Sequence, residues 1–193
     1  MPFQTVPASA CWQHRGLRSG FEVVYFSSEP SGLRVDGTAT GFQDDETWVV
    51  DYQLLLDSHW RTRRALVTTR SVSGSVERLV ESDGAGHWSI DGVAAGHLDG
   101  CFDVDLESSA FTNALPVHRL DLGVGESADA PAAYVRLGAA RVERLDQHYG
   151  RLADQDTERR YDYQAPVFDF RCQISYDRAG LVLDYPGIAL RAG

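Results

Sequence analysis

The chain has 193 residues, of which 28 are acidic and 18 are basic, so its net charge is −10. This excess of negative charge argues against nucleic acid, or an anionic membrane surface, as a general partner. No stretch approaches the roughly 20 apolar residues that a transmembrane segment needs, so we expect none. The length predicts a single domain over residues 1–193.

The cysteines and histidines show no disulfide or metal-binding pattern. Cys11, Cys101 and Cys172 form no CxxC pair, and the histidines show no HxH or HExxH spacing. Residues 1–18 also lack the apolar run of a signal peptide. We therefore expect reduced thiols, a cytoplasmic protein, and neither a metal nor another cofactor.

Alternating polar and apolar residues predict strands along the first part of the chain. Residues 21–26 are rich in β-forming side chains and end at a loop-forming stretch, residues 27–32. Residues 33–41 also alternate, and residues 47–56 form the clearest early strand. The apolar side of that strand consists of Trp48, Val50, Tyr52, Leu54 and Leu56.

The next region continues this pattern and adds strong turn signals. Residues 61–70 are β-like, and residues 76–80 and 88–90 are expected to form a hairpin around Asp83-Gly84. Strands and turns that alternate every 8 to 12 residues, roughly, are typical of an all-β sandwich or barrel. We therefore predict an all-β fold.

The central stretch places two carboxylates on one side of a predicted strand. Over residues 100–106, Cys101, Asp103 and Asp105 point one way and the intervening apolar side chains point the other. If the apolar side is buried, the carboxylates must meet water, arginines or a ligand.

A turn is expected after this strand. Asn113 favours a turn, with its side chain bonded to nearby backbone, and Pro116 favours an extended residue before it. A second strand is predicted over residues 120–124. Farther along, residues 167–176 and 181–185 are predicted strands, and residues 174–182 resemble residues 80–88 in outline. This weak internal repeat relates residues about 21–95 to residues about 101–193.

Two arginines, Arg61 and Arg63, suggest either a polar ligand or ion pairs with carboxylates of adjacent strands. Arg61 and Arg63 lie on one side of their strand, next to Trp60 in sequence, and guanidinium groups beside aromatic rings suit a sugar or phosphate group. They would equally pair with carboxylates on adjacent strands. We expect the Arg61/Arg63 side to share a common space with the Asp103/Asp105 side.

Six blocks of the sequence resemble the bacterial putative glycolipid-binding family. They follow the family order, at residues 57–63, 83–88, 100–106, 111–120, 147–149 and 180–187. The resemblance implies an antiparallel, open or partly closed β-barrel built from two related halves, similar to bacterial lipoprotein carriers. It also implies strands at 134–137 and 142–149, although helix propensity is high over residues 132–153.

From the residues and the resemblance together, we expect non-enzymatic binding of an amphipathic small molecule, a glycolipid or related lipid, in a barrel cavity. The candidate ligand-binding residues are Trp60, Arg61, Arg63, Asp103, Asp105, Asn113, Arg119 and Tyr149. Two alternatives stay open. One is an enzyme with an acid–base site centred on Asp103 and Asp105. The other is a structural or protein-interaction module whose barrel is filled by side chains.

Overall fold

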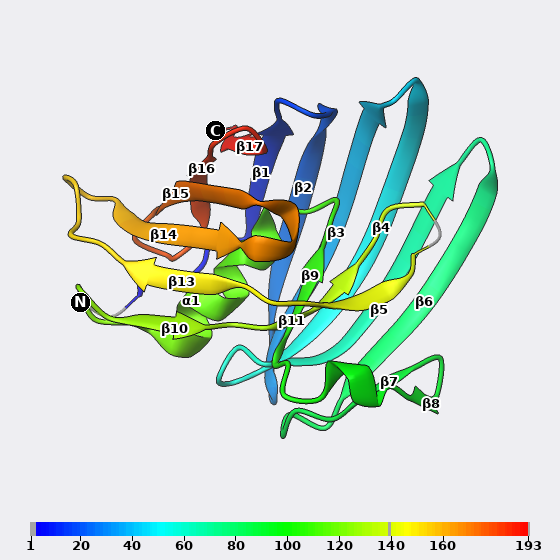
Figure 1. The fold of residues 1–193 in the computed structure, drawn as a ribbon, viewed down its shortest axis with the longest axis horizontal. Helices are drawn as coiled ribbons and strands as arrows, with labels where there is room; N and C mark the ends of the chain where they lie inside the picture. The colour runs from blue at the N-terminus through cyan, green and yellow to red at the C-terminus, as the bar shows by residue number, and fades with distance from the viewer. Residues whose placement is uncertain (1–2, 139, 193) are drawn as a thin grey trace.

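The computed structural model describes residues 3–138 and 140–192, which form mostly β-structure (Figure 1). The first half contributes β1 (Ser9–His14), β2 (Ser19–Glu29), β3 (Gly32–Gln43), β4 (Glu46–Asp57), β5 (Thr62–Ser71), β6 (Gly74–Ser82), β7 (Trp88–Ile90) and β8 (Val93–Ala94). The second half contributes β9 (Asp103–Leu106), β10 (Ser127–Asp129), β11 (Ala132–Val135), β12 (Val142–Leu145), β13 (His148–Arg151), β14 (Arg159–Ala165), β15 (Phe170–Tyr176), β16 (Val182–Tyr185) and β17 (Ala189–Arg191). The helical elements are η1 (Gly96–Leu98), η2 (Phe111–Asn113), α1 (Ala114–Leu120) and η3 (Pro166–Phe168).

Fourteen of these strands form one large sheet, in the order β10-β13-β14-β15-β16-β17-β1-β2-β3-β4-β5-β6-β7-β8. Neighbouring strands in it run antiparallel, and the edge strands β10 and β8 do not pair with each other. The sheet curls without closing, as Figure 1 shows for the long strands β2 to β6 and the crossing strands β13 to β15. This architecture confirms the predicted all-β, open or partly closed antiparallel barrel.

The long strands follow the alternation of the sequence. On β4 the side chains of Trp48, Val50, Tyr52, Leu54 and Leu56 are all buried, as predicted. The predicted hairpin is also present, since Val80 pairs with Ile90 and Ser82 with Trp88. Its turn is held by the Asp83 carboxylate, which accepts bonds from the backbone N–H groups of Ala85 and His87.

A second, three-stranded sheet carries the central stretch. Its order is β12-β11-β9, with β9 parallel to β11 and β12 antiparallel to β11. Strands β11 and β12 of this sheet and β13 of the large sheet confirm the predicted β-structure after residue 132, as three strands where two were expected. All four residues of β9 are buried, so the two aspartates lie inside the protein.

The prediction for residues 113–124 was wrong. The chain forms η2 and then α1, so Leu115 is helical rather than extended, and residues 121–126 form no strand. Pro116 is tolerated because it lies in the first turn of α1, where its missing N–H has no helical partner. The buried side chains of Leu115 and Val117 outweigh the preference of a residue before proline for extended backbone.

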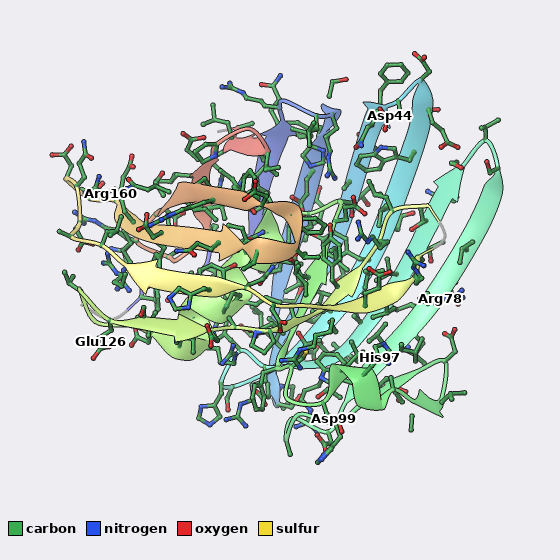
Figure 2. The ribbon with its side chains drawn as sticks, viewed as in Figure 1. Asp44, Arg78, His97, Asp99, Glu126 and Arg160 are labelled. Atoms are coloured by element: carbon green, nitrogen blue, oxygen red, sulfur yellow. The ribbon has the colours of Figure 1, made fainter. Side chains whose placement is uncertain are left out.

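The segment from β9 to α1 lies inside the curl of the large sheet and contacts strands from both of its arms. Glu22 on β2 bonds to the Ser109 hydroxyl and the Ala110 N–H, and Tyr176 on β15 donates to the Asn113 carbonyl. Charged side chains such as Asp44 and Glu126 lie at the periphery instead (Figure 2). The central segment is thus the part of the core that positions the candidate site.

Candidate ligand-binding cavity

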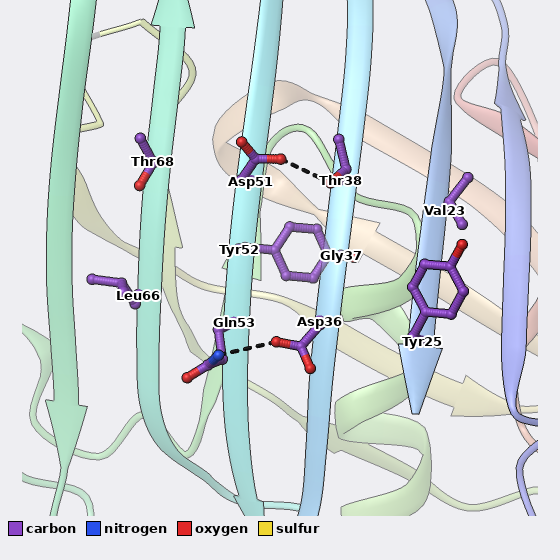
Figure 3. Close-up of a pocket in the computed structure, with 10 residues that line it drawn as sticks. All are labelled: Val23, Tyr25, Asp36, Gly37, Thr38, Asp51, Tyr52, Gln53, Leu66 and Thr68. Carbon is purple, nitrogen blue, oxygen red and sulfur yellow. Dashed lines mark hydrogen bonds between the residues drawn. The ribbon is translucent and has the colours of Figure 1, made fainter. Parts of the chain in front are cut away.

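The outer face of the large sheet carries a shallow depression of about 480 Å³, drawn in Figure 3. Four of its polar side chains are paired with one another. Thr38 donates to the Asp51 carboxylate at 2.8 Å, and Gln53 donates to Asp36 at 3.0 Å. Tyr52 lies behind Gly37, because its ring occupies the space where any other side chain at 37 would go. Satisfied polar groups on an open surface make this depression a poor ligand site.

A larger and more apolar cavity, about 570 Å³ in volume, opens on the inner side of the curl. Its volume is in the range of small-molecule sites. Most of its walls are aromatic or aliphatic, and a few polar side chains come from the segment after β9. The residues that line it are Gly16, Leu17, Arg18, Asp105, Leu106, Glu107, Ser109, Asn113, Tyr134, Leu145, Tyr163, Ala165, Phe168, Phe170, Tyr185, Gly187 and Ile188.

Asp105 is the more buried of the two carboxylates that line this cavity, the other being Glu107. The Asp105 side chain accepts a bond from the Thr112 hydroxyl at 2.8 Å and one from the Gln147 amide at 2.6 Å. The same amide donates to the Tyr163 hydroxyl at 3.0 Å. Burial raises the pKa of Asp105 to about 6, although the two hydrogen bonds oppose that rise. The cavity therefore holds a carboxyl group that titrates near neutral pH.

We expect Asp105 to make the protein less stable as the pH rises from about 4 to 6. The pKa of its folded state, about 6, lies above the usual unfolded value of about 3.9, so the folded state holds the proton more tightly. This contribution is complete below about pH 4 and is lost as the pH rises through 6. The difference corresponds to about 3 kcal/mol of unfolding free energy. Urea unfolding between pH 4 and 8 should show this decline in the wild type and a flatter profile in Asp105→Asn; identical profiles would contradict it.

Asp103 is committed to a buried ion pair. Arg119 on α1 donates to both of its oxygens, with Nη2 to Oδ2 at 2.7 Å and Nε to Oδ1 at 3.0 Å. The Asp103 side chain is 2% exposed and the Arg119 side chain 13%. Burial raises the pKa of Asp103, and the Arg119 guanidinium acts in the opposite direction. Asp103 and Arg119, both predicted to contact ligand, pair with each other and do not line the cavity.

The prediction that the Arg61/Arg63 side and the Asp103/Asp105 side share a common space was correct only in part. The Arg61 charge opposes the rise in the pKa of Asp103 that burial causes, but the Arg61 guanidinium bonds to the Gly84 carbonyl and lies over the Phe102 ring. Arg63 bonds to the Ser82 carbonyl and approaches Asp57 at 4.0 Å. Within the described part of the chain no ion pair joins Arg63 to Asp105. The two arginines bond instead to backbone carbonyls of the β6–β7 hairpin.

Trp60 lies at a different place again. Its ring stacks on the His118 ring, with the centroids 3.5 Å apart and the planes 2° from parallel. Both residues line a separate open pocket together with Phe3 and Leu33. Trp60, Arg61 and Arg63 are therefore not among the residues that line the apolar cavity with Asp105.

Asn113 reaches the cavity, but its bonds differ from those predicted. Its side-chain oxygen accepts a bond from the Tyr149 hydroxyl at 3.0 Å, and no nearby backbone group bonds to its side chain among the described residues. Tyr149 is buried and fixes the Asn113 side chain through this bond, but it does not itself line the cavity. Of the eight predicted site residues, the structure brings Asp105 and Asn113 together at the cavity, with Tyr149 as a support.

Several cavity residues were not singled out from the sequence. The aromatic walls form edge-to-face contacts, with Tyr163 and Tyr185 centroids 5.7 Å apart and Phe170 and Tyr185 centroids 6.1 Å apart. In the predicted strand over residues 167–176, Phe170 alternates with polar and charged side chains, which is a signal for one apolar side. The sequence carried no signal that Leu17, in a turn between β1 and β2, belongs to the same cavity as Phe170.

The described residues offer no metal site, since no group of three His, Cys, Asp or Glu side chains is arranged to hold an ion. None of the helices that the structure describes is long and apolar enough to cross a membrane.

Comparison with known proteins identifies the family. Residues 9–191 match the family described as "Putative glycolipid-binding". The chain belongs to this family. It is similar to a crystal structure of a DUF1089 family protein from Pseudomonas aeruginosa, with 31% identity, 89% of this chain and 92% of that chain covered, and a TM-score of 0.75. None of the curated proteins matches the chain significantly.

A more distant structure supports the fold alone. A β-barrel-like protein of DUF1849, a domain of unknown function, from Brucella abortus shares 13% identity with a TM-score of 0.56. The match covers 98% of this chain and 95% of that chain. The family membership supports a binding role in general.

Proposed function

We propose that this member of the family binds one amphipathic molecule, a glycolipid or related lipid, in the inner cavity. The observation that carries the proposal is the composition of the cavity: a small polar group of Asp105, Ser109 and Asn113 within largely aromatic walls. A site with apolar walls and a few placed polar groups suits a ligand that is partly polar and partly apolar. The family description favours a glycolipid over other amphipathic molecules.

Binding is favoured over acid–base catalysis by the surroundings of Asp105. Catalytic carboxyl groups act together with a second acid, base or nucleophile within hydrogen-bonding reach of the reacting atoms. Of the two neighbouring carboxylates, Asp103 is held by Arg119, and Glu107 accepts a bond from the Leu137 N–H. No histidine or cysteine is among the described residues that line the cavity. The cavity volume of about 570 Å³ also favours binding over a barrel filled by side chains.

We expect a residue that fills the cavity to abolish ligand retention. Ala165 is a buried, small residue in the cavity wall, so Ala165→Phe should occupy the space of the ligand. Thr38→Phe is the matched control, because it blocks the outer depression instead. The test extracts each purified protein with organic solvent and identifies bound lipid by mass spectrometry.

The wild type and Thr38→Phe should yield the same amphipathic compound, near one molecule per protein, and Ala165→Phe should yield none. A circular dichroism spectrum matching that of the wild type would show that Ala165→Phe has folded. Equal amounts from Ala165→Phe and the wild type, or loss only in Thr38→Phe, would contradict the proposal.

A further inference from the structure

The buried part of the inner cavity holds polar as well as apolar side chains, whereas two large apolar side chains lie exposed at its mouth. Asp105, Ser109 and Asn113 are only 7%, 5% and 4% exposed. By contrast, Leu17 is 76% exposed and Phe168 is 42% exposed. A cavity built for an alkyl chain inside and a polar group outside would have the reverse arrangement, because apolar chain atoms gain most from a dry, apolar interior.

The floor of the cavity, around Asp105 and Asn113, still has hydrogen-bonding capacity to offer a ligand. A carboxylate has about four acceptor positions, and Asp105 uses two of them for Thr112 and Gln147. The Asn113 side-chain oxygen is taken by Tyr149, but within the described chain no acceptor meets its NH2 group. An acceptor next to a donor matches a hydroxyl group, which donates one bond and accepts others.

The walls between floor and mouth are aromatic. Tyr163 and Phe170 have their ring centroids 6.2 Å apart, and Tyr134 and Phe168 have theirs 5.8 Å apart. Flat rings of this kind offer wide apolar faces to a ring-shaped ligand while its edges meet polar groups. A sugar has apolar C–H faces and hydroxyl groups at its edges, so its shape and polarity fit this part of the cavity.

The charges around the cavity disfavour an anionic group at the floor. Asp105 lies at the floor, and the nearby carboxylates of Asp103 and Glu107 add negative charge. Among the described residues that line the cavity, the one cation is Arg18. Its guanidinium bonds to the Glu107 backbone carbonyl and lies 5.9 Å from the centre of the Trp48 ring, and none of the described ion pairs includes it. A phosphate or carboxylate bound beside Asp105 would meet like charge at the floor.

The geometry points to binding in which the ligand enters head first: a neutral, hydroxyl-rich head such as a sugar sits at Asp105 and Asn113, and the alkyl chain leaves the cavity over Leu17 and Phe168. This inference rests on the proposed function and adds the orientation and charge class of the ligand. It also explains why two large apolar side chains lie exposed at the cavity mouth, where the first part of the alkyl chain would cover them.

The orientation can be measured with spin-labelled probes. Two probes derive from octyl β-D-glucoside, one with a nitroxide at the end of the alkyl chain and one with a nitroxide on a sugar hydroxyl. Each is added to isotope-labelled protein below the concentration at which it forms micelles, and NMR line broadening is recorded. The chain-end probe should broaden the signals of Leu17 and Phe168 more strongly than those of Asp105 and Asn113, and the sugar probe should show the reverse order. Stronger broadening at Asp105 and Asn113 by the chain-end probe would overturn the head-first orientation.

The charge class is tested by titration calorimetry at pH 8 with unlabelled probes. Octyl glucoside should bind at least tenfold more tightly than octanoate. Asp105→Asn should reduce this ratio, because it weakens the binding of octyl glucoside and removes the like charge that opposes the binding of octanoate. Leu17→Glu should weaken octyl glucoside several-fold, whereas Val72→Glu, a control at a similarly exposed apolar residue, should not. Preferential binding of octanoate would overturn the inference. Failure of every probe to bind would count against the proposed function itself.

Discussion

Replacing Arg119 with methionine should destabilise the protein by about 3 to 5 kcal/mol at pH 7, because the variant leaves the buried Asp103 carboxylate without its partner. In the wild type, Arg119 meets both oxygens of a side chain that is 2% exposed, so water cannot take its place. A loss of this size is a large share of the stability of an ordinary domain. Urea unfolding, followed by circular dichroism, gives the free energy.

The pH dependence and a double variant identify the cause of this loss. At pH 4 the Arg119→Met penalty should shrink, because the unpaired Asp103 carboxyl, whose pKa burial already raises in the wild type, then takes up a proton. Adding Asp103→Asn should recover more than half of the loss at pH 7, since a neutral amide replaces the stranded charge. Equal losses in the single and double variants would mean that Arg119 acts through its packing over the Phe102 ring instead.

Replacing Glu22 with alanine should cost about 3 to 5 kcal/mol, because four donors lose their acceptor at once. Glu22 is fully buried on β2, and its oxygens accept bonds from the Tyr52 hydroxyl at 2.6 Å and the Ser109 hydroxyl at 2.5 Å. They also accept bonds from the backbone N–H groups of Ala110 and Phe111. Glu22 thereby fixes the segment that lines the cavity to the long strands of the sheet.

Glu22→Gln is the control for hydrogen bonding without charge. The amide oxygen can accept from the Ala110 N–H, while the Tyr52 and Ser109 hydroxyls can rotate to accept from the amide NH2. Thermal and urea unfolding should therefore place Glu22→Gln within about 2 kcal/mol of the wild type. If glutamine were as costly as alanine, the ionised form of Glu22 rather than its hydrogen bonds would be what holds the segment.

The regular strands were predictable because their signal is local. In β4 the side chains from Trp48 to Leu56 alternate between core and solvent, and one pattern of period two fixes which side is buried. The central segment was harder to predict, because β9 is buried on both sides and Pro116 fits the first turn of a helix as well as a turn. Tertiary packing around Leu115 decided between the two conformations.

The candidate site was predictable only in part, for a related reason. Asp105 and Asn113 come from neighbouring parts of one segment, so the sequence could place them near each other. The partners of Arg61 and Arg63 are hairpin carbonyls, which are present at every residue and leave no trace in the side-chain pattern. Leu17 and Phe168 both lie at the cavity mouth, although they are far apart in the sequence, and only the curl of the sheet brings them together.

The most direct test of ligand binding in the inner cavity is NMR chemical-shift mapping with unlabelled octyl β-D-glucoside. We expect saturable shifts, at one ligand per protein, in the backbone amide signals of Ser109, Asn113 and Phe170 at the cavity. The signals of Thr38 and Asp51 in the outer depression should stay unchanged. Saturable shifts confined to Thr38 and Asp51, or shifts at Asn113 that persist unchanged in Ala165→Phe, would contradict a ligand site in the cavity.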